Sequence, residues 1–133
     1  MDELSIVPFR YKYLPALLDM LQSQNYQGIA DINMNALPKI GYMVMMNGHP
    51  IAAGFLRKVE GGLAQLDGLT SNAYFGSQIR HEGIKLIVDT LIKEAKALKL
   101  KGIIATTQDE GILKRAVSLG FYYVPHTVIA LKL

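Results

Sequence analysis

The chain has 133 residues, half of them hydrophobic, with 14 Lys and Arg against 11 Asp and Glu and no cysteine. This length fits one domain with its own core over residues 1–133, and the lack of cysteine excludes disulfides, thiolate metal sites and a cysteine nucleophile. Apolar runs stay well short of the roughly 18 residues of a membrane span, and the acidic start lacks a signal-peptide pattern, so we expect a soluble, cytoplasmic protein.

The first third of the chain predicts an edge strand, a helix and a loop. Apolar residues gather over residues 4–10, and Pro8 places that strand at a sheet edge because proline cannot donate to a ladder. Over residues 13–22, leucines recur at spacings of three and four, as on a buried helix face. The weaker pattern over residues 23–39 predicts a loop that holds one short helix or none.

Three strands follow, over residues 40–46, 50–59 and 63–70. Asn47-Gly48 separates the first two, and this dipeptide is the strongest short signal for a hairpin. Glu60-Gly61-Gly62 marks the second turn. The segment therefore predicts an antiparallel meander.

Residues 77–98 predict a long helix, because apolar residues recur on one stripe with a 3.6-residue period. The strand predicted over residues 103–107 should lie parallel to residues 63–70, since a helix crosses between them. Lysines near the end of the helix complement its dipole on a solvated face, which argues against a nucleic-acid partner. The net charge of +3 favours an anionic ligand without requiring a nucleic acid.

Asp109 can cap a short helix that Gly120 ends, and residues 121–124 and 127–133 predict two final strands. The chain thus predicts an α/β fold. We expect a mixed sheet of six to seven strands, helices on both faces and a central parallel strand pair. An exposed last strand would make a homodimer feasible.

The junction between Gly68-Leu69-Thr70 and the long helix predicts an anion-binding site. A polar helix start leaves backbone N–H groups unpaired, and the helix dipole adds positive charge there. Gly83 costs about 1 kcal/mol relative to alanine inside a helix. Either a bound phosphate or close packing of the helix on a strand explains it.

The element order, Arg80-His81-Glu82-Gly83-Ile84 and the closing Ser118-Leu119-Gly120-Phe121 resemble the GNAT superfamily of acyl-CoA-dependent N-acetyltransferases. The cofactor motif of that family reads Arg or Gln, two residues, Gly, one residue, then Gly or Ala. Arg80 and Gly83 match it, whereas Lys85 replaces the last small residue. The resemblance covers nearly the whole chain and implies the family's fold.

The resemblance implies acetyl-CoA, or another acyl-CoA, as cofactor. Its pyrophosphate would be wrapped by backbone amides of residues 80–85, where Lys85 either crowds the turn or supplies charge to it. The pantetheine arm would pair with the backbone at Gly68, Leu69 and Thr70. Asp109 stands where the family often has Asn at a helix start, and so joins the candidate cofactor residues.

Ala116 stands where many family members have the Tyr that protonates the departing thiolate. The expected activity is direct acyl transfer to an amine on a small molecule or a protein. The alternative is a GNAT-shaped protein without turnover that binds a macromolecule or belongs to a virion. The absence of the Tyr and the presence of Lys85 in the motif favour this alternative. The chain also resembles the short acetyltransferase-like proteins of tailed phages, which would place it in the host cytoplasm.

Acyl transfer to an amine needs a base, and Asp67 is the first candidate. An unpaired carboxylate among apolar residues holds a proton more tightly than usual, which suits that role. The alternative is an ion pair with Arg57 or Lys58 across the hairpin. Tyr122 is a candidate acid in place of the missing Tyr. The three histidines are scattered, so we expect no metal site.

Overall fold

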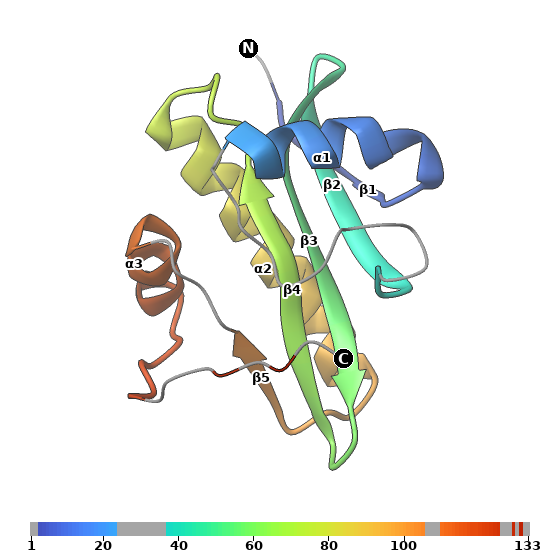
Figure 1. Cartoon of the computed structure of the whole chain (residues 1–133), viewed down its shortest axis with the longest axis vertical. Coiled ribbons are helices and arrows are strands. Elements are labelled where there is room, and N and C mark those ends of the chain that lie inside the picture. The colour runs from blue at the N-terminus through green and yellow to red at the C-terminus, as the bar shows by residue number, and fades with distance from the viewer. Residues whose placement is uncertain (1–2, 24–36, 106–109, 126–128, 130, 132–133) are drawn as a thin grey trace.

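The computed structural model describes residues 3–23, 37–105, 110–125, 129 and 131, which form a five-stranded mixed sheet with helices (Figure 1). The strands lie side by side in chain order. They are β1 (Ser5–Pro8), β2 (Ile40–Met46), β3 (His49–Val59), β4 (Leu63–Ser71) and β5 (Gly102–Ala105).

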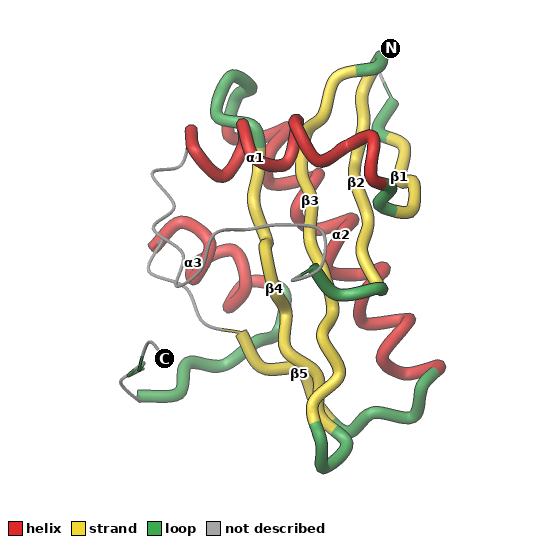
Figure 2. Tube along the Cα trace, turned by 45° about the vertical axis from the view of Figure 1, so that its right-hand side comes forward, coloured by secondary structure: helices red, strands yellow, loops and turns green. Residues whose placement is uncertain are grey.

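The helices lie on both faces of this sheet, as the sequence predicted. A short 3-10 helix, η1 (Tyr11–Tyr13), leads into α1 (Leu14–Ser23) on one face, and the long α2 (Ser77–Ala97) covers the other face (Figure 2). A third helix, α3 (Glu110–Ser118), lies beyond β4 on the β5 side and has no fully buried residue.

The predicted meander and parallel pair are confirmed. β1 pairs antiparallel with β2 at the sheet edge, and β2, β3 and β4 form consecutive antiparallel pairs. Asn47 and Gly48 both have positive φ, 51° and 79°, as a type I′ hairpin turn requires. β5 runs parallel to β4, because α2 carries the chain across the sheet between them.

Two hydrophobic cores occupy the two sides of the sheet. The larger core lies under α2, whose Ile84, Ile87 and Leu91 pack onto the strands. The smaller core lies under α1 and combines Leu17, Met20 and Leu21 of the helix with Met43, Ala53 and Phe55 of β2 and β3. The apolar stripe read from the sequence is the buried face of α2; in α1, Leu17 and Leu21 are buried as predicted, whereas Leu18 is 40% exposed and Met20 is buried in its place.

The parallel pair lies at the edge of the sheet within the described residues, and not at its centre as predicted. Residues 121–125 form no strand, so the sheet has five described strands and the predicted count of six to seven is not reached. A segment whose side chains alternate between two faces forms a strand only where a neighbouring strand pairs with it. Tyr122 and Tyr123 are instead 85% and 65% exposed. Most of the other predicted strand, residues 127–133, falls outside the described residues.

Candidate functional site

β4 carries a bulge near its end, and the bulge lies beside the candidate site. Phe55 of β3 pairs with Asp67 and Ala53 pairs with Thr70, so Gly68 and Leu69 together stand opposite one residue of β3. Gly68 has a φ of +60°, a left-handed conformation that glycine adopts easily. A glycine within a predicted strand is the sequence signal that could have located this bulge.

Within the described residues, the pairing between β4 and β5 extends up to Leu66, just before the bulge. Leu66 pairs with Ala105, and the arrow of β5 turns away from β4 at its end (Figure 1). Among the described residues, no strand pairs with residues 67–71 on that side.

The N-terminus of α2 follows β4 after a short loop. Its N-cap is Gly76, which provides no side-chain hydrogen bond, and a Cβ at this position would meet no atom within 4 Å. The Arg80 N–H donates to the Gly76 carbonyl at 3.1 Å, so regular helical bonding begins with that amide. The amides of residues 77–79 precede it, and among the described residues they donate to no backbone carbonyl.

Residues 80–85, the predicted phosphate turn, lie within α2 and not at its start. Gly83 is buried, and a Cβ there would come within 2.9 Å of Ile51 Cγ2 and 3.2 Å of Ala52 Cβ on β3. Close packing of α2 on β3 therefore accounts for this glycine. Lys85, two turns into the helix, forms an exposed ion pair with Asp89 at 3.2 Å.

The other members of the predicted turn have structural contacts of their own. Arg80 Nε donates to Ser71 Oγ at 2.9 Å and so ties the first turns of α2 to the end of β4. Glu82 accepts a hydrogen bond from Gln78 at 3.0 Å on the exposed helix surface. His81 is half-buried and Ile84 belongs to the core under α2.

Asp67 forms an ion pair with Arg57, with 2.6 Å between Oδ2 and Nε, which is one of the two arrangements that the sequence left open. Its side chain lies on the α1 face, because its partner Phe55 belongs to the core under α1. Tyr122 lies in an exposed coil after α3, and Ala116 lies on α3. Asp109 falls outside the described residues.

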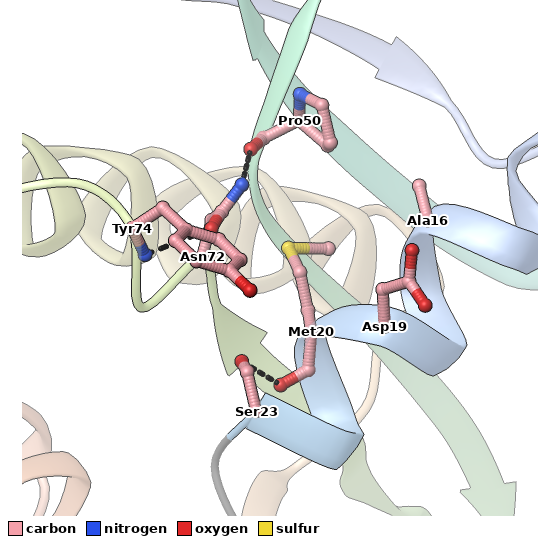
Figure 3. A pocket seen from close by; sticks show the side chains of 7 residues that line it. All are labelled: Ala16, Asp19, Met20, Ser23, Pro50, Asn72 and Tyr74. Atoms are coloured by element: carbon pink, nitrogen blue, oxygen red, sulfur yellow. Dashed lines mark hydrogen bonds between the residues drawn. The ribbon is translucent and has the colours of Figure 1, made fainter.

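A cavity of about 240 Å³ opens between α1, the start of β3 and the loop after β4 (Figure 3). Sequence reasoning missed it. One face of α1 supplies four of its residues, at spacings of three and four, and the loop supplies two more. The lining residues are Ala16, Asp19, Met20, Ser23, Pro50, Asn72 and Tyr74.

Within the described residues, no group of three or more His, Cys, Asp or Glu side chains could hold a metal ion. None of the helices in that same part of the chain combines the length and the hydropathy needed to cross a bilayer.

No family model and no curated protein matches this sequence. Solved structures do match. A Mycobacterium tuberculosis protein in complex with CoA aligns with a TM-score of 0.74 and 17% identity over 95% of this chain and 76% of its own.

Two further matches are acetyltransferases. A GNAT-family acetyltransferase from Staphylococcus aureus aligns with a TM-score of 0.67 and 15% identity over 89% of this chain and 82% of its own. An aminoglycoside N-acetyltransferase in complex with CoA aligns with a TM-score of 0.67 and 16% identity over 99% and 96%. The chain therefore has the fold of GNAT acetyltransferases.

Proposed function

We propose that this protein transfers an acyl group from acyl-CoA, in the simplest case acetyl-CoA, to an amine. The observation that carries the proposal is the bulge of β4 at Gly68 and Leu69, which lies just beyond Leu66, the last residue of β4 whose pairing with β5 is described. The open N-terminus of α2 follows it closely in the chain. Similarity to two structures that contain CoA supports the same assignment.

The open helix start fits a diphosphate in charge and in space. Three consecutive amides of residues 77–79 point along the helix axis, and the dipole adds about half a positive charge there. A Cβ added at Gly76 would meet no atom within 4 Å, so the space directly around the N-cap is open. We therefore place the diphosphate at residues 76–79, one turn before the turn suggested by the GNAT-like motif.

The edge of β4 would hold the pantetheine arm through the backbone of Gly68, Leu69 and Thr70. When bound, acyl-CoA supplies an activated carbonyl: its C–S bond breaks as the amine nitrogen bonds to carbon, and the amine's proton ends on the thiol. The left-handed Gly68 turns the backbone at this point, so bulge amides can face an oxygen that gains negative charge. Holding both reactants in place would supply much of the rate.

Asp67 remains the proposed base. It immediately precedes the bulge, and its ion pair with Arg57 fixes the direction of the carboxylate. One oxygen, Oδ2, contacts Arg57, and the carboxylate keeps further lone pairs that can accept a proton from an ammonium group, directly or through one water.

A second candidate function is binding of acyl-CoA or a macromolecule without turnover. The arrangement of the acid candidates favours it, because Tyr122 is 85% exposed in a coil and α3 carries Ala116 in place of Tyr. In that case CoA can stabilise the protein while no amine is acylated. The virion or phage setting suggested by the sequence belongs to this candidate.

The test is a thermal unfolding assay with CoA and acetyl-CoA, run on the wild type and on a Ser77→Glu variant. Ligand at a hundred times its Kd stabilises a protein by about 2.7 kcal/mol. Ser77 is exposed in the first turn of α2, so a carboxylate there favours the helix but repels phosphate. Ala97→Glu adds the same charge at the far end of this helix and serves as the control.

We expect CoA to stabilise the wild type and Ala97→Glu but not Ser77→Glu. Equal stabilisation of all three proteins would mean that the diphosphate lies elsewhere. No stabilisation of any protein at millimolar CoA would refute acyl-CoA binding. Stabilisation without acylation of any amine would support the second candidate.

A further inference from the structure

Exposed apolar side chains gather in the C-terminal part of the chain. Among the described residues, twelve large hydrophobic side chains are exposed, and seven of them lie between residues 104 and 131. We call these seven the apolar flank: Ile104, Val117, Tyr122, Tyr123, Val124, Ile129 and Leu131. Together they expose on the order of 900 Å², whereas the largest apolar patch of a typical monomer measures about 300–600 Å².

The apolar flank belongs to one side of the sheet. Ile104 is part of β5, Val117 is part of α3, and the other five residues follow α3 in the chain. Figures 1 and 2 both show α3 and the coil that leaves it on the β5 side of the sheet. No residue of α3 is buried, so this helix leaves its own apolar side chains without full cover.

The segment after α3 also lacks charge. No Asp, Glu, Lys or Arg occurs between Arg115 and Lys132. Exposed surface normally carries many such residues. The buried centre of a protein interface is instead depleted of them and enriched in Tyr, as at Tyr122 and Tyr123. The composition of this segment is therefore that of a surface covered by another protein.

β5 adds a strand edge that nothing in its sequence protects. It is the last strand in the order of the described sheet, and no described strand pairs with its outer side. Its residues Gly102–Ala105 include neither a charge nor a proline, the usual means by which an edge resists pairing. By contrast, β1 at the opposite edge ends in Pro8. The outer side of β5 can therefore accept a strand from another chain.

A second copy of this chain fits both features at once. Residues 121–125 are coil that pairs with no described strand, and β5 is an edge without a described neighbour. Each copy thus carries both halves of one contact, which is the self-complementarity that a twofold dimer needs. The area of the apolar flank also matches the roughly 800 Å² that each partner buries in an interface of standard size.

We infer that the protein forms a twofold homodimer in which the segment after α3 of each copy lies along β5 of the other. Backbone hydrogen bonds at the β5 edge would hold the two segments, as in other cases of strand addition. Tyr122 and Tyr123 supply the large apolar contacts, and Ile104 and Val117 lie beside them in the same interface. The dimer is independent of the proposed function, since no part of the argument involves CoA.

The first test is analytical ultracentrifugation of the wild type over a range of protein concentrations, without CoA. We expect a reversible equilibrium between monomer and dimer. Tyr122→Asp places a charge in the apolar flank and should raise the dimer Kd at least about tenfold. Tyr74→Asp is the matched control, because Tyr74 is 91% exposed in the loop before α2, outside the flank, and it should leave the Kd unchanged. Both side chains are exposed, so neither change should unfold the monomer.

The second test uses the absence of natural cysteine in this chain. A protein with Ile104→Cys is mixed with a protein that carries either Tyr122→Cys or Val124→Cys, and the mixture is oxidised. We expect a disulfide between two chains in at least one mixture, because the dimer brings these positions together. Ile104→Cys mixed with Tyr74→Cys is the control and should give no such product.

The same substitutions combined in one chain separate the two ways in which β5 can be covered. A dimer predicts disulfides between chains, whereas a segment that folds back on its own β5 predicts disulfides within one chain. Disulfides only within one chain overturn the inference. A protein that stays monomeric at every concentration also overturns it, as does a dimer whose Kd is the same in Tyr122→Asp and wild type.

Discussion

Gly83→Ala tests how closely α2 packs on β3. Alanine improves helix propensity by about 1 kcal/mol at this position. Its methyl group would lie 2.9 Å from Ile51 Cγ2 and 3.2 Å from Ala52 Cβ. Both neighbours are fully buried and the Ala52 Cβ is fixed to the backbone, so the overpacking penalty should be about 2 kcal/mol. We expect a net loss of about 1 kcal/mol in the free energy of unfolding.

The assay is urea unfolding followed by circular dichroism, for Gly83→Ala alone and in an Ile51→Ala background. Ile51→Ala removes the nearest methyl group and should itself cost about 2–4 kcal/mol. In that background Gly83→Ala should be neutral or stabilising, because the main clash is gone while the helix propensity remains. The change of sign is the signature of direct contact between the two residues.

A Gly83→Ala protein that is more stable than the wild type would refute this reasoning. It would also restore the ligand explanation of Gly83 if the same variant lost affinity for CoA. A less stable variant that keeps its CoA affinity, measured below its unfolding temperature, would assign the glycine to packing alone.

Other substitutions probe the remaining contacts. Tyr42→Phe should lose about 1 kcal/mol at neutral pH, because the Tyr42 hydroxyl donates to Glu94. That bond raises the pKa of Tyr42 above 10.0. The contribution of the bond to the free energy of unfolding should therefore be complete below pH 10 and vanish as pH rises through the raised pKa. Urea midpoints of wild type and Tyr42→Phe that still differ at higher pH would contradict this. Asp67→Asn should reduce acylation at least about a hundredfold while changing stability by less than about 1 kcal/mol, since the ion pair with Arg57 is partly exposed; unchanged kcat would exclude Asp67 as the base. Gly68→Ala should lose about 2 kcal/mol, because its φ is +60° and a phenyl ring of β3 lies 3.0 Å from the new methyl group; an unchanged urea midpoint would be inconsistent with the bulge.

The elements that depend on local chemistry were predictable from the sequence. Asn47-Gly48 specifies its own turn, and the apolar stripe of the long helix predicted its start at Ser77 as the structure has it. The parallel direction of β5 followed from the helical crossover. Each of these predictions uses residues that are close in sequence, where turn and helix geometry leave few alternatives.

The site was less predictable, because it depends on which backbone groups remain unpaired. Arg80 and Gly83 match a cofactor motif, yet their amides lie beyond the first turn of α2, where helical bonding already uses them. The prediction of a strand over residues 121–124 was wrong, because an alternating pattern of side chains does not show whether a neighbouring strand is there to pair with. The residues that line the cavity come from α1, β3 and the loop after β4, so only the fold brings them together, and no local sequence pattern signals the cavity.

The order of the strands also bears on how the chain folds and opens. Two short turns join β2, β3 and β4, so these strands can pair as successive hairpins within microseconds. The helix α2 then packs on one face of the sheet that they form. β5 has four described residues and no residue of α3 is fully buried, so the described part of this flank adds few buried side chains to the cooperative unit. We expect its amides to exchange with deuterium well before those of β3. We then expect β5 and α3 to unfold locally from the side of β4 while the rest of the sheet stays folded.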